Sequence, residues 1–363
     1  MKSFTWTDFA RGVVRQAILG GLILAPLAIP LIGQDRVRLV RNEKERRVDI
    51  LIDGKPFTSY IWPENLKKPV LFPLRTAQGT VVTRGFPLDP RPGESVDHPH
   101  QVGSWFNYGD VNGVDFWNNS IYRTAQEAGK MGTIVHRRII AIKSGGTRGE
   151  LAVAQDWLLP DGTRILQETT RFTFYGAKGR RFVDRVTTLK ALNAKVVFKD
   201  SKEGLFGLRV RRELEQPAKE PILLTDANGK AVDSPILDNA GVSGEFRSSE
   251  GKTGDDVWGT RGRWASLGGE VIQEPITIVI FDNPGNPGFP TYWMARGYGL
   301  FAANPLGQKA YSSEKKEAII RELNLALAPG KSVTFRYRLL IASERLTTQQ
   351  IELDYRKFAG ETR

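Results

Sequence analysis

Short runs of β-branched and aromatic residues recur along this chain between turn-forming residues, and apolar residues at helical spacing are scarce. Residues 46–51 and 55–60 flank Asp53 and Gly54, a pair that supplies the positive φ angles of a tight hairpin turn. The same pattern predicts strands at residues 114–117, 151–158, 164–175, 181–193, 205–214, 276–282 and 332–341. It predicts an all-β fold, a large antiparallel β-sandwich, with residues 36–363 as one domain.

Two segments depart from the strand pattern. Leu346, Ile351 and Tyr355 stand at helical spacing, which predicts a short C-terminal helix over residues 347–358 that packs on a sheet. Residues 215–251 are rich in Pro, Gly, Ser and Asp and are interpreted as a surface excursion. A domain boundary there is the weaker interpretation, because the strands on its two sides resemble each other in length and pattern.

Residues 1–35 have the pattern of an export signal. Three basic residues precede an apolar run at residues 17–33, and polar residues follow it. Pro26 and Pro30 interrupt the run, which favours a cleaved signal peptide over an uncleaved N-terminal anchor. We expect an exported protein, periplasmic or extracellular, that contacts the membrane only if the anchor is retained.

The charge and cysteine content exclude several classes of function. The formal net charge is +12, and basic proteins gain affinity for nucleic acids by releasing counterions from phosphates. The basic residues are nevertheless spread from Arg36 to Arg363 with acidic residues between them, and no nucleic-acid-binding module is present. We therefore expect no nucleic-acid partner. The absence of cysteine excludes disulfides, thiol nucleophiles and Cys-ligated zinc.

Residues 97–117 hold two of the three histidines of the chain. On an extended strand, His98 and His100 would point to the same face, because side chains two residues apart do so. With His136 on a neighbouring strand, they could bind Zn²⁺ or another divalent transition metal. Without a metal, a histidine is a natural general base, because its pKa lies near neutrality, and Asp97 could orient the ring. Both hypotheses stay open beside a purely structural role.

Acid–base chemistry also needs a complementary carboxylate. Glu168 and Glu203 each interrupt a strand-like stretch with a charge, so both are candidate catalytic residues. Either could equally be a solvated charge at a strand edge.

Residues that suit a sugar follow the histidines. Aromatic faces stack on the C–H faces of pyranose rings, and amides and carboxylates form hydrogen bonds with hydroxyl groups. The candidate substrate-binding residues in this segment are Asp97, Gln101, Trp105, Asn107, Asp110, Asp115 and Trp117. The structural alternative is a hairpin that turns at Asn112 and Gly113 and places Trp117 in the core.

Residues 282–304 form a second cluster, rich in Pro and Gly, of the kind that makes rigid ligand-binding loops. Its candidate substrate-binding residues are Asn283, Asn286, Trp293, Arg296 and Asn304. Arg296 could bind a carboxylate through two parallel hydrogen bonds. The structural alternative is an Ω-loop.

Several long motifs together resemble one family. Residues 72–74, 83–87, 97–117, 202–210, 282–287 and 293–305 are similar to those of the DUF6807 family, which also carries the label "methane oxygenase PmoA", and the resemblance covers essentially the whole mature chain. The sequence departs at Gln101, where the family pattern tends to show another histidine, which disfavours a metal site built only of histidines. A subunit of particulate methane monooxygenase needs several transmembrane helices, and this chain has at most one candidate, so we treat the label as misassigned.

The resemblance implies an exported protein that occurs alongside carbohydrate-degrading enzymes. It also implies the large supersandwich of galactose mutarotase-like proteins, a class that uses histidine and carboxylate pairs on sugar rings. We therefore predict a carbohydrate-active enzyme that hydrolyses, eliminates or epimerises a glycoside or an oxidised sugar. The predicted bases or metal ligands are His98 and His100, supported by His136. The predicted carboxylates are Glu203 and Glu168, and the predicted ring platforms are Trp105, Trp117 and Trp293. The alternatives are a non-catalytic glycan-binding protein and a metal-dependent oxidoreductase.

Overall fold

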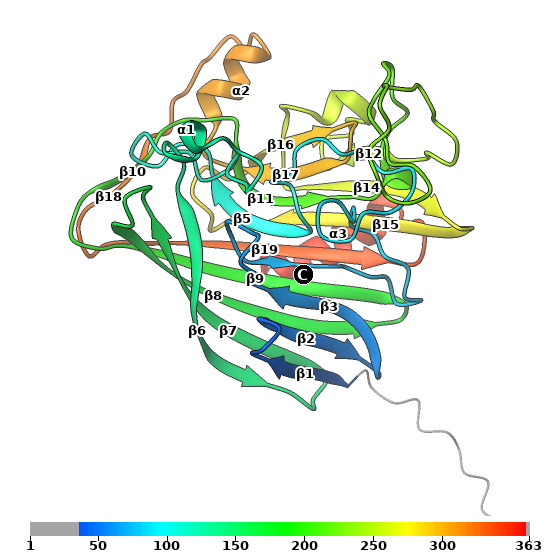
Figure 1. Ribbon diagram of the computed structural model, residues 1–363, viewed down its shortest axis with the longest axis horizontal. Helices are drawn as coiled ribbons and strands as arrows, with labels where there is room; N and C mark the ends of the chain where they lie inside the picture. The colour runs from blue at the N-terminus through cyan, green and yellow to red at the C-terminus, as the bar shows by residue number, and fades with distance from the viewer. Residues whose placement is uncertain (1–35, 361–363) are drawn as a thin grey trace, which may run out of the picture. The chain divides into compact units, whose positions relative to one another are not determined.

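The strands of this protein form two large antiparallel sheets in a computed structural model that describes residues 36–360 (Figure 1). The nine-stranded sheet contains, in spatial order, β1 (Val37–Asn42), β2 (Arg47–Ile52), β3 (Lys55–Ile61), β4 (Val70–Leu71), β5 (Ser104–Tyr108), β11 (Gly204–Arg209), β17 (Leu300–Asn304), β16 (Thr291–Arg296) and β13 (Arg261–Gly262). The eight-stranded sheet contains β12 (Glu245–Ser248), β14 (Trp264–Val271), β15 (Glu274–Asp282), β19 (Ser332–Ala342), β9 (Arg180–Ala191), β8 (Arg164–Ala177), β7 (Arg148–Leu158) and β6 (Thr133–Lys143). A third sheet pairs β10 (Val196–Phe198) with β18 (Leu325–Leu327). The predicted antiparallel all-β class is confirmed.

Turn chemistry places the strand ends where the sequence indicates them. Asp53 (φ 53°) and Gly54 (φ 75°) both adopt the left-handed conformation between β2 and β3, as a two-residue hairpin turn requires. The predicted strand at residues 114–117 is wrong. The carboxylate of Asp115 accepts hydrogen bonds from the backbone N–H groups of Trp117 (2.7 Å) and Asn118 (3.0 Å), which turns the chain out of the sheet.

The two large sheets face each other across the main hydrophobic core. Phe106 of β5 lies 5.8 Å from Phe335 of β19, and Phe206 of β11 stacks on Tyr337 of β19 at 5.1 Å between ring centroids. Each of these four side chains is at most 3% exposed. Burial of one such side chain stabilises the fold by roughly 1.5–3 kcal/mol, so this layer fixes the two sheets against each other.

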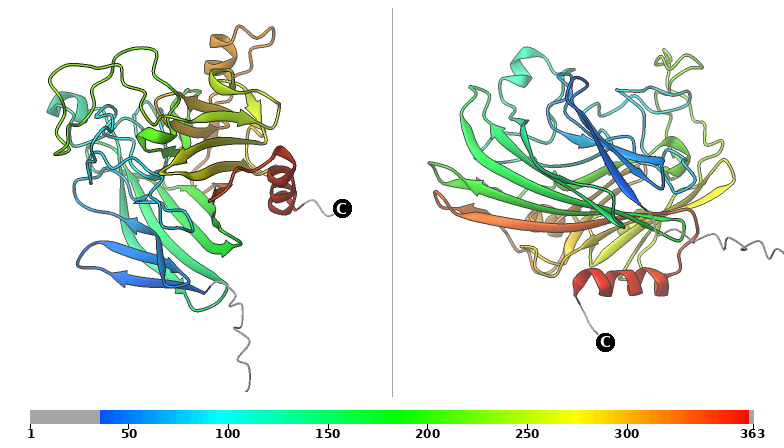
Figure 2. Two further views of the ribbon diagram at one scale, coloured as in Figure 1. Left: turned by 90° about the vertical axis from the view of Figure 1, so that its right-hand side faces the viewer. Right: turned by 90° about the horizontal axis from the view of Figure 1, so that it is seen from below.

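A helix covers part of the outer face of the eight-stranded sheet. Helix α3 (Thr348–Ala359) begins at a capping box on Thr347 and ends at Gly360, which has a φ of 76°. Figure 2 shows this helix lying along the eight-stranded sheet near the C-terminus. Its Ile351 and Tyr355 are buried against Phe281 of β15 and neighbouring residues. The predicted C-terminal helix is confirmed.

Loops and short helices cover the outer face of the nine-stranded sheet. The cross-strand register places Trp105, Gly207, Ala302 and Met294 in one row across β5, β11, β17 and β16 on this face. The short helices in the loops are α1 (Ala125–Ala128), α2 (Gln308–Glu314), η1 (Arg212–Leu214) and η2 (Gly254–Val257). The lack of a side chain on Gly207 makes room for the indole of Trp105, which lies 2.7 Å from where a Cβ of residue 207 would stand. The candidate site lies on this loop-covered side of the sheet.

Residues 36–360 all belong to one compact unit. Among them, no helix is long and apolar enough to cross a membrane. The predicted signal peptide or anchor at residues 1–35 lies outside the described residues and stays a prediction.

Candidate functional site

His98 and His100 lie in a turn, which corrects the prediction of an extended strand. The backbone of His98 is left-handed (φ 42°), and the N–H of Gln101 donates to the carbonyl oxygen of His98 at 2.9 Å. The alternation of side chains along a strand therefore does not apply. The two imidazole rings stand at 74° to each other with centroids 5.7 Å apart.

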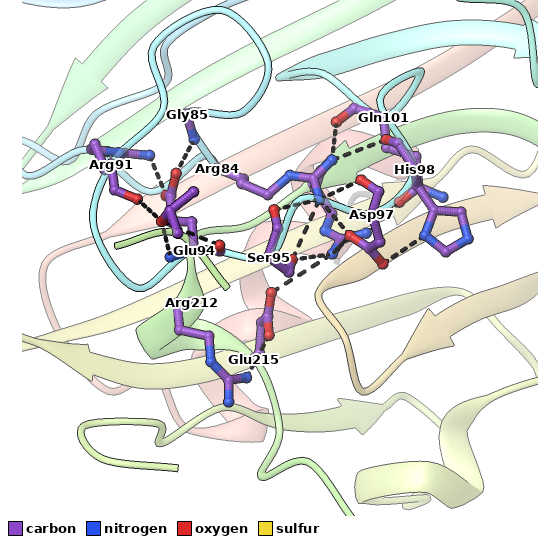
Figure 3. Close-up of polar contacts among 12 residues, drawn as sticks. Arg84, Gly85, Arg91, Glu94, Ser95, Asp97, His98, Gln101, Arg212 and Glu215 are labelled. Carbon is purple, nitrogen blue, oxygen red and sulfur yellow. Dashed lines mark hydrogen bonds and ion pairs between the residues drawn. The ribbon is translucent and has the colours of Figure 1, made fainter. Parts of the chain in front are cut away.

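Two buried arginines fix Asp97 (Figure 3). Oδ1 of Asp97 accepts hydrogen bonds from Nη1 of Arg84 (2.5 Å) and Nη2 of Arg209 (2.7 Å), and neither guanidinium side chain is exposed. Burial alone would raise the pKa of Asp97, but Arg209, the hydrogen bond from His98, and Arg84 together hold the pKa well below its usual range. Asp97 is therefore an anion throughout the physiological pH range.

Asp97 in turn orients His98. Oδ2 of Asp97 lies 2.6 Å from Nδ1 of His98, so Nδ1 carries the proton of the neutral ring and Nε2 is left as the proton acceptor. The imidazole stacks on the ring of Tyr298 at 4.9 Å and 4°. Its side chain is 40% exposed, and within residues 36–360 its Nε2 has no hydrogen-bond partner. This geometry is that of a general base.

Glu203 and Arg296 are charged groups without a partner near this histidine. Within the described part of the chain, the Glu203 carboxylate forms no hydrogen bond or ion pair. Burial raises the pKa of Glu203, Asp115 raises it further, and the nearby charges of Lys202, Arg296 and His98 only partly oppose these effects. The Arg296 guanidinium stacks on Trp258 at 4.3 Å and has no carboxylate partner among the same residues. A carboxyl group with a raised pKa thus lies within electrostatic reach of both Arg296 and His98.

His100 is buried behind His98 against a buried lysine. It is 3% exposed, and neither ring nitrogen has a hydrogen-bond partner in the described structure. Burial lowers the pKa of His100 to about 2, with Lys68 contributing, so the ring is neutral. Nζ of Lys68 donates to the His100 carbonyl oxygen at 2.6 Å and lies 5.5 Å from the ring centroid of Trp105. Burial lowers the pKa of Lys68 to about 7, although Asp115 opposes this shift.

The structure places Glu168 elsewhere, inside the sandwich. Its carboxylate accepts hydrogen bonds from Trp157 (2.9 Å), Thr170 (2.6 Å) and Arg185 (2.8 Å), and also from Gln155 (2.9 Å). It is fully buried, and Arg185 also lies 4.8 Å from the ring of Phe106 in the core. Glu168 is therefore not brought together with His98.

His136 also lies apart from the other two histidines. Its Nδ1 is 3.0 Å from the hydroxyl of Tyr60, and its ring stacks on Trp62 at 4.1 Å. Burial lowers the pKa of His136 to about 4. Residues 36–360 contain no group of three or more His, Asp or Glu side chains that could hold a metal ion. The donor set does not fit the predicted metal, because Asp97 is already bound to two arginines and the three imidazoles do not converge.

The predicted ring platforms are buried in the protein. Trp105, Trp117 and Trp293 are each fully buried. Trp105 and Trp117 pack edge to face on the outer side of the nine-stranded sheet, whereas Trp293 lies in the core between the sheets. None of them offers an open face to a sugar. The aromatic faces near His98 and Arg296 belong instead to Tyr298 and Trp258.

Most of the predicted polar ligands bind the protein's own backbone. Three amide side chains donate to backbone carbonyl oxygens: Asn107 to Phe116, Asn286 to Arg336 and Asn304 to Ser201. Three side-chain oxygens accept from backbone N–H groups: Asp110 from Gly113, Asp115 from Trp117 and Asn283 from Gly285. Gln101 is different, because its Oε1 accepts from Nη1 of Arg209 at 2.7 Å and so supports the site. The structure thus brings together Asp97, His98, Gln101, Glu203 and Arg296, with His100 behind them.

Four further residues belong to this site and were not predicted from the sequence: Arg84, Arg209, Trp258 and Lys68. Arg84 and Arg209 lie inside the motifs at residues 83–87 and 202–210, which carry the family resemblance, so a signal for them existed. Lys68 sits in an ordinary Lys-Lys-Pro segment that gives no such signal.

The family model described as "Family of unknown function (DUF6807)" matches residues 47–356. The chain belongs to the DUF6807 family. All residues of the DUF6807 site described above lie within the matched range. A search of curated protein sequences finds no match.

Solved structures similar to this DUF6807 chain include sugar-processing proteins by name. One is a GH36 α-galactosidase from Geobacillus stearothermophilus, at 10% identity and a TM-score of 0.40 over 84% of this chain and 41% of that one. Another is the galactosidase domain of an α-galactosidase–sucrose kinase, at 9% identity and a TM-score of 0.40 over 85% and 42%. A third is a galactose mutarotase-like protein from Lactobacillus casei, at 10% identity and a TM-score of 0.29 over 84% and 99%. The DUF6807 chain spans about two fifths of the length of each galactosidase structure.

Proposed function

We propose that this protein is a carbohydrate-active enzyme that removes a proton from an oxidised sugar with His98 and returns a proton from Glu203. The observation that carries the proposal is the Asp97–His98 pair, in which Nε2 of His98 has no hydrogen-bond partner within residues 36–360. The Glu203 carboxyl group, also unpaired among these residues, has a raised pKa and feels the charge of His98. Acid–base sites typically contain two titratable groups whose surroundings favour the proton-accepting form of one and the proton-donating form of the other.

Each member of the pair has a defined role. Asp97 stays ionised between its two arginines, so it stabilises the imidazolium that forms when His98 accepts a proton at Nε2. Glu203 keeps its proton to a higher pH than a free carboxyl group, which makes it the donor. The Arg296 guanidinium would stabilise negative charge that develops on a carbonyl or carboxylate oxygen of the substrate.

These roles favour proton abstraction next to a carbonyl group over hydrolysis by two carboxylates. Hydrolysis of the usual kind needs two free carboxylates across the glycosidic bond, whereas the site offers one. In elimination, the C–H electron pair forms a double bond while Glu203 protonates the departing oxygen. In epimerisation, Glu203 protonates the same carbon from the opposite face. His98 and Arg209 already lie over the ring of Tyr298, and Arg296 and Lys315 over that of Trp258. Support for a sugar substrate therefore comes from the polar groups of the site and not from free aromatic faces.

The test is incubation in D₂O with oligosaccharides, uronic-acid oligomers and 3-keto-glycosides, with products and deuterium uptake measured by mass spectrometry. We expect deuterium in the recovered sugar or an unsaturated product, and loss of both in His98→Ala and Glu203→Gln. Absence of any product and any binding across the panel contradicts the sugar proposal. Tight binding without turnover, unchanged in His98→Ala, indicates a non-catalytic glycan-binding protein instead.

We also propose export, on the basis of the basic and apolar pattern in residues 1–35. Cell fractionation followed by N-terminal sequencing of the recovered protein tests it. An intact N-terminus on a protein in the cytoplasm contradicts it.

A further inference from the structure

A cleft of about 260 Å³ lies next to Tyr298, the residue that stacks on His98. Its lining includes Gln216, Pro217, Ala218, Ile222, Gly297 and Tyr298. The backbone N–H of Gln216 donates to the carbonyl oxygen of Gly297 at 2.8 Å, and its side chain donates to Oδ1 of Asp255 at 2.7 Å. These hydrogen bonds connect three separate segments of the chain, so the fold itself fixes the shape of the cleft.

Tyr298 is shared between this cleft and the proposed catalytic site. Its ring lines the cleft and also stacks on His98 at 4.9 Å. Below it, Glu215 lines the cleft and lies 3.7 Å from Arg209, the arginine that holds Asp97. His98 and the cleft are therefore in contact with the same aromatic side chain.

The chemistry of the lining suits a sugar ring. Pro217, Ala218, Ile222 and the ring of Tyr298 supply apolar surface, and Gln216 supplies an amide. Pyranose rings present C–H faces to apolar groups and hydroxyl groups to polar ones. The volume lies just under the roughly 300 Å³ at which sites for small molecules begin, so the cleft suits one ring better than a long chain.

We propose that this cleft holds a second pyranose ring, so that the substrate is a glycoside of at least two units. The inference rests on the proposed function, because it takes the sugar that reacts at His98 as its starting point. The second ring would contribute binding energy remote from the reacting atoms, which enzymes use to orient the reacting ring.

The test compares two substitutions on the same excursion. Ala218→Trp fills the cleft, and the backbone of Ala218 keeps its two hydrogen bonds with the side chain of Asn239. Leu223→Trp adds the same side chain at a neighbouring position that is 41% exposed and does not line the cleft. Ile222→Ala, which widens the cleft, serves as a third variant if Ala218→Trp does not fold. The probes are 3-keto-cellobiose, 3-keto-lactose, 3-keto-maltose and digalacturonate, in which the non-reducing sugar is oxidised, and each is paired with the methyl glycoside of that oxidised sugar.

Binding is measured by calorimetry and turnover by mass spectrometry for each probe pair. We expect Ala218→Trp to lower binding and kcat/KM about tenfold or more for a disaccharide and less than twofold for its methyl glycoside, because only the second ring meets the new side chain. Leu223→Trp should match the wild type, and Ile222→Ala should raise the disaccharide KM by about tenfold, the lower range for a lost apolar contact.

The outcomes separate the two proposals. Equal effects of Ala218→Trp on both members of a pair, or no effect on either, overturn the second-ring site while the proposed reaction stands. Disaccharide binding that Ala218→Trp weakens, without turnover by the wild type, supports the second-ring site and overturns the reaction. A wild-type protein that binds none of the probes overturns both.

Discussion

Glu168 and Glu203 look alike in the sequence, since each interrupts a strand-like stretch with a charge, but their surroundings are opposite. Glu168 lies between the two sheets and accepts hydrogen bonds from four side chains, one of them the guanidinium of Arg185. Glu203 lies on the loop-covered side of the nine-stranded sheet, where no side chain of the described residues bonds its carboxylate. A buried charge whose hydrogen bonds are all made within the protein stabilises the fold, whereas a charge without such partners is available to bind a ligand.

The difference follows from what covers each place. Inside the sandwich the two sheets exclude water, so every buried charge must find its partners within the protein. On the outer face, loops meet at the sheet centre, and His98, Glu203 and Arg296 keep free polar atoms there. If this distinction is correct, substitutions on the outer face reduce activity, and substitutions inside the sandwich reduce stability.

The largest expected effect is the loss of activity in His98→Gln. The substitution removes the proton acceptor at Nε2, and general bases typically contribute about 10²–10⁴-fold to the rate. The free energy of unfolding should change by less than about 1 kcal/mol, because the side chain is 40% exposed. The matched control is His136→Gln, which removes the histidine stacked on Trp62 and should leave kcat/KM within twofold. Equal losses in the two variants contradict the comparison.

The next largest effect is the loss of stability in Glu168→Gln. It leaves the buried guanidinium of Arg185 without its counter-charge, and breaking a buried pair in this way typically costs about 3–5 kcal/mol. Glu203→Gln should leave stability unchanged or slightly increased, because the carboxylate it removes has no partner within residues 36–360 and is disfavoured by burial. Urea unfolding followed by tryptophan fluorescence measures both. Similar losses in the two variants show that Glu203 also serves the fold.

Local signals predicted the parts of the fold that depend on a few neighbouring residues. The Asp53–Gly54 turn and the capped helix α3 were both accessible in this way, because turn and cap chemistry act over two to four residues. The pairing of β5 with β11, nearly a hundred residues later, has no local signal.

The faces of the central strands could not be assigned from the sequence for a different reason. Every residue of β5 and of β17 is buried, and so are the first five of β16, because loops cover the face opposite the core. Polar and apolar residues therefore do not alternate clearly, and the sequence does not indicate on which face of β16 the Trp293 side chain lies. The left-handed backbone of His98 could not be predicted either, since nothing in the segment Asp-His-Pro-His requires a positive φ.

Lys68 is buried like Glu168, but within residues 36–360 it has only one hydrogen-bond partner, the carbonyl oxygen of His100. Burial lowers its pKa to about 7 in the folded protein, against 10.5 for a free lysine. Between these pH values the unfolded chain binds more protons than the folded one, so this residue makes the free energy of unfolding rise as the pH rises from 7 towards 10.5. Its contribution to the free energy of unfolding is greatest above pH 10.5 and is lost as the pH falls through 7.

The measurement is the difference in unfolding free energy between wild type and Lys68→Met from pH 7 to pH 9. We expect the free energy of unfolding of the wild type to rise, relative to that of Lys68→Met, by at most about 1.4 kcal/mol for each pH unit. Lys67→Met, at a partly exposed neighbour, is the control. Parallel curves for wild type and Lys68→Met show that Lys68 stays charged in the folded protein and that one partner suffices.

The smallest effect is expected at Tyr298, whose ring positions His98 without taking part in the proton transfer. Tyr298→Leu removes the stacking contact, and aromatic pairs of this kind contribute about 0.5–1.5 kcal/mol, which corresponds to roughly a two- to tenfold loss in kcat/KM. Tyr298→Phe keeps the stacked ring and loses only the hydroxyl, so it should retain most of the activity. A positioning role also predicts that Tyr298→Leu lowers kcat more than it changes KM, and that Tyr298→Phe keeps both close to the wild-type values. If both variants lose activity equally, the hydroxyl rather than the stacked ring supports the site, and the orientation of His98 then rests on Asp97 alone.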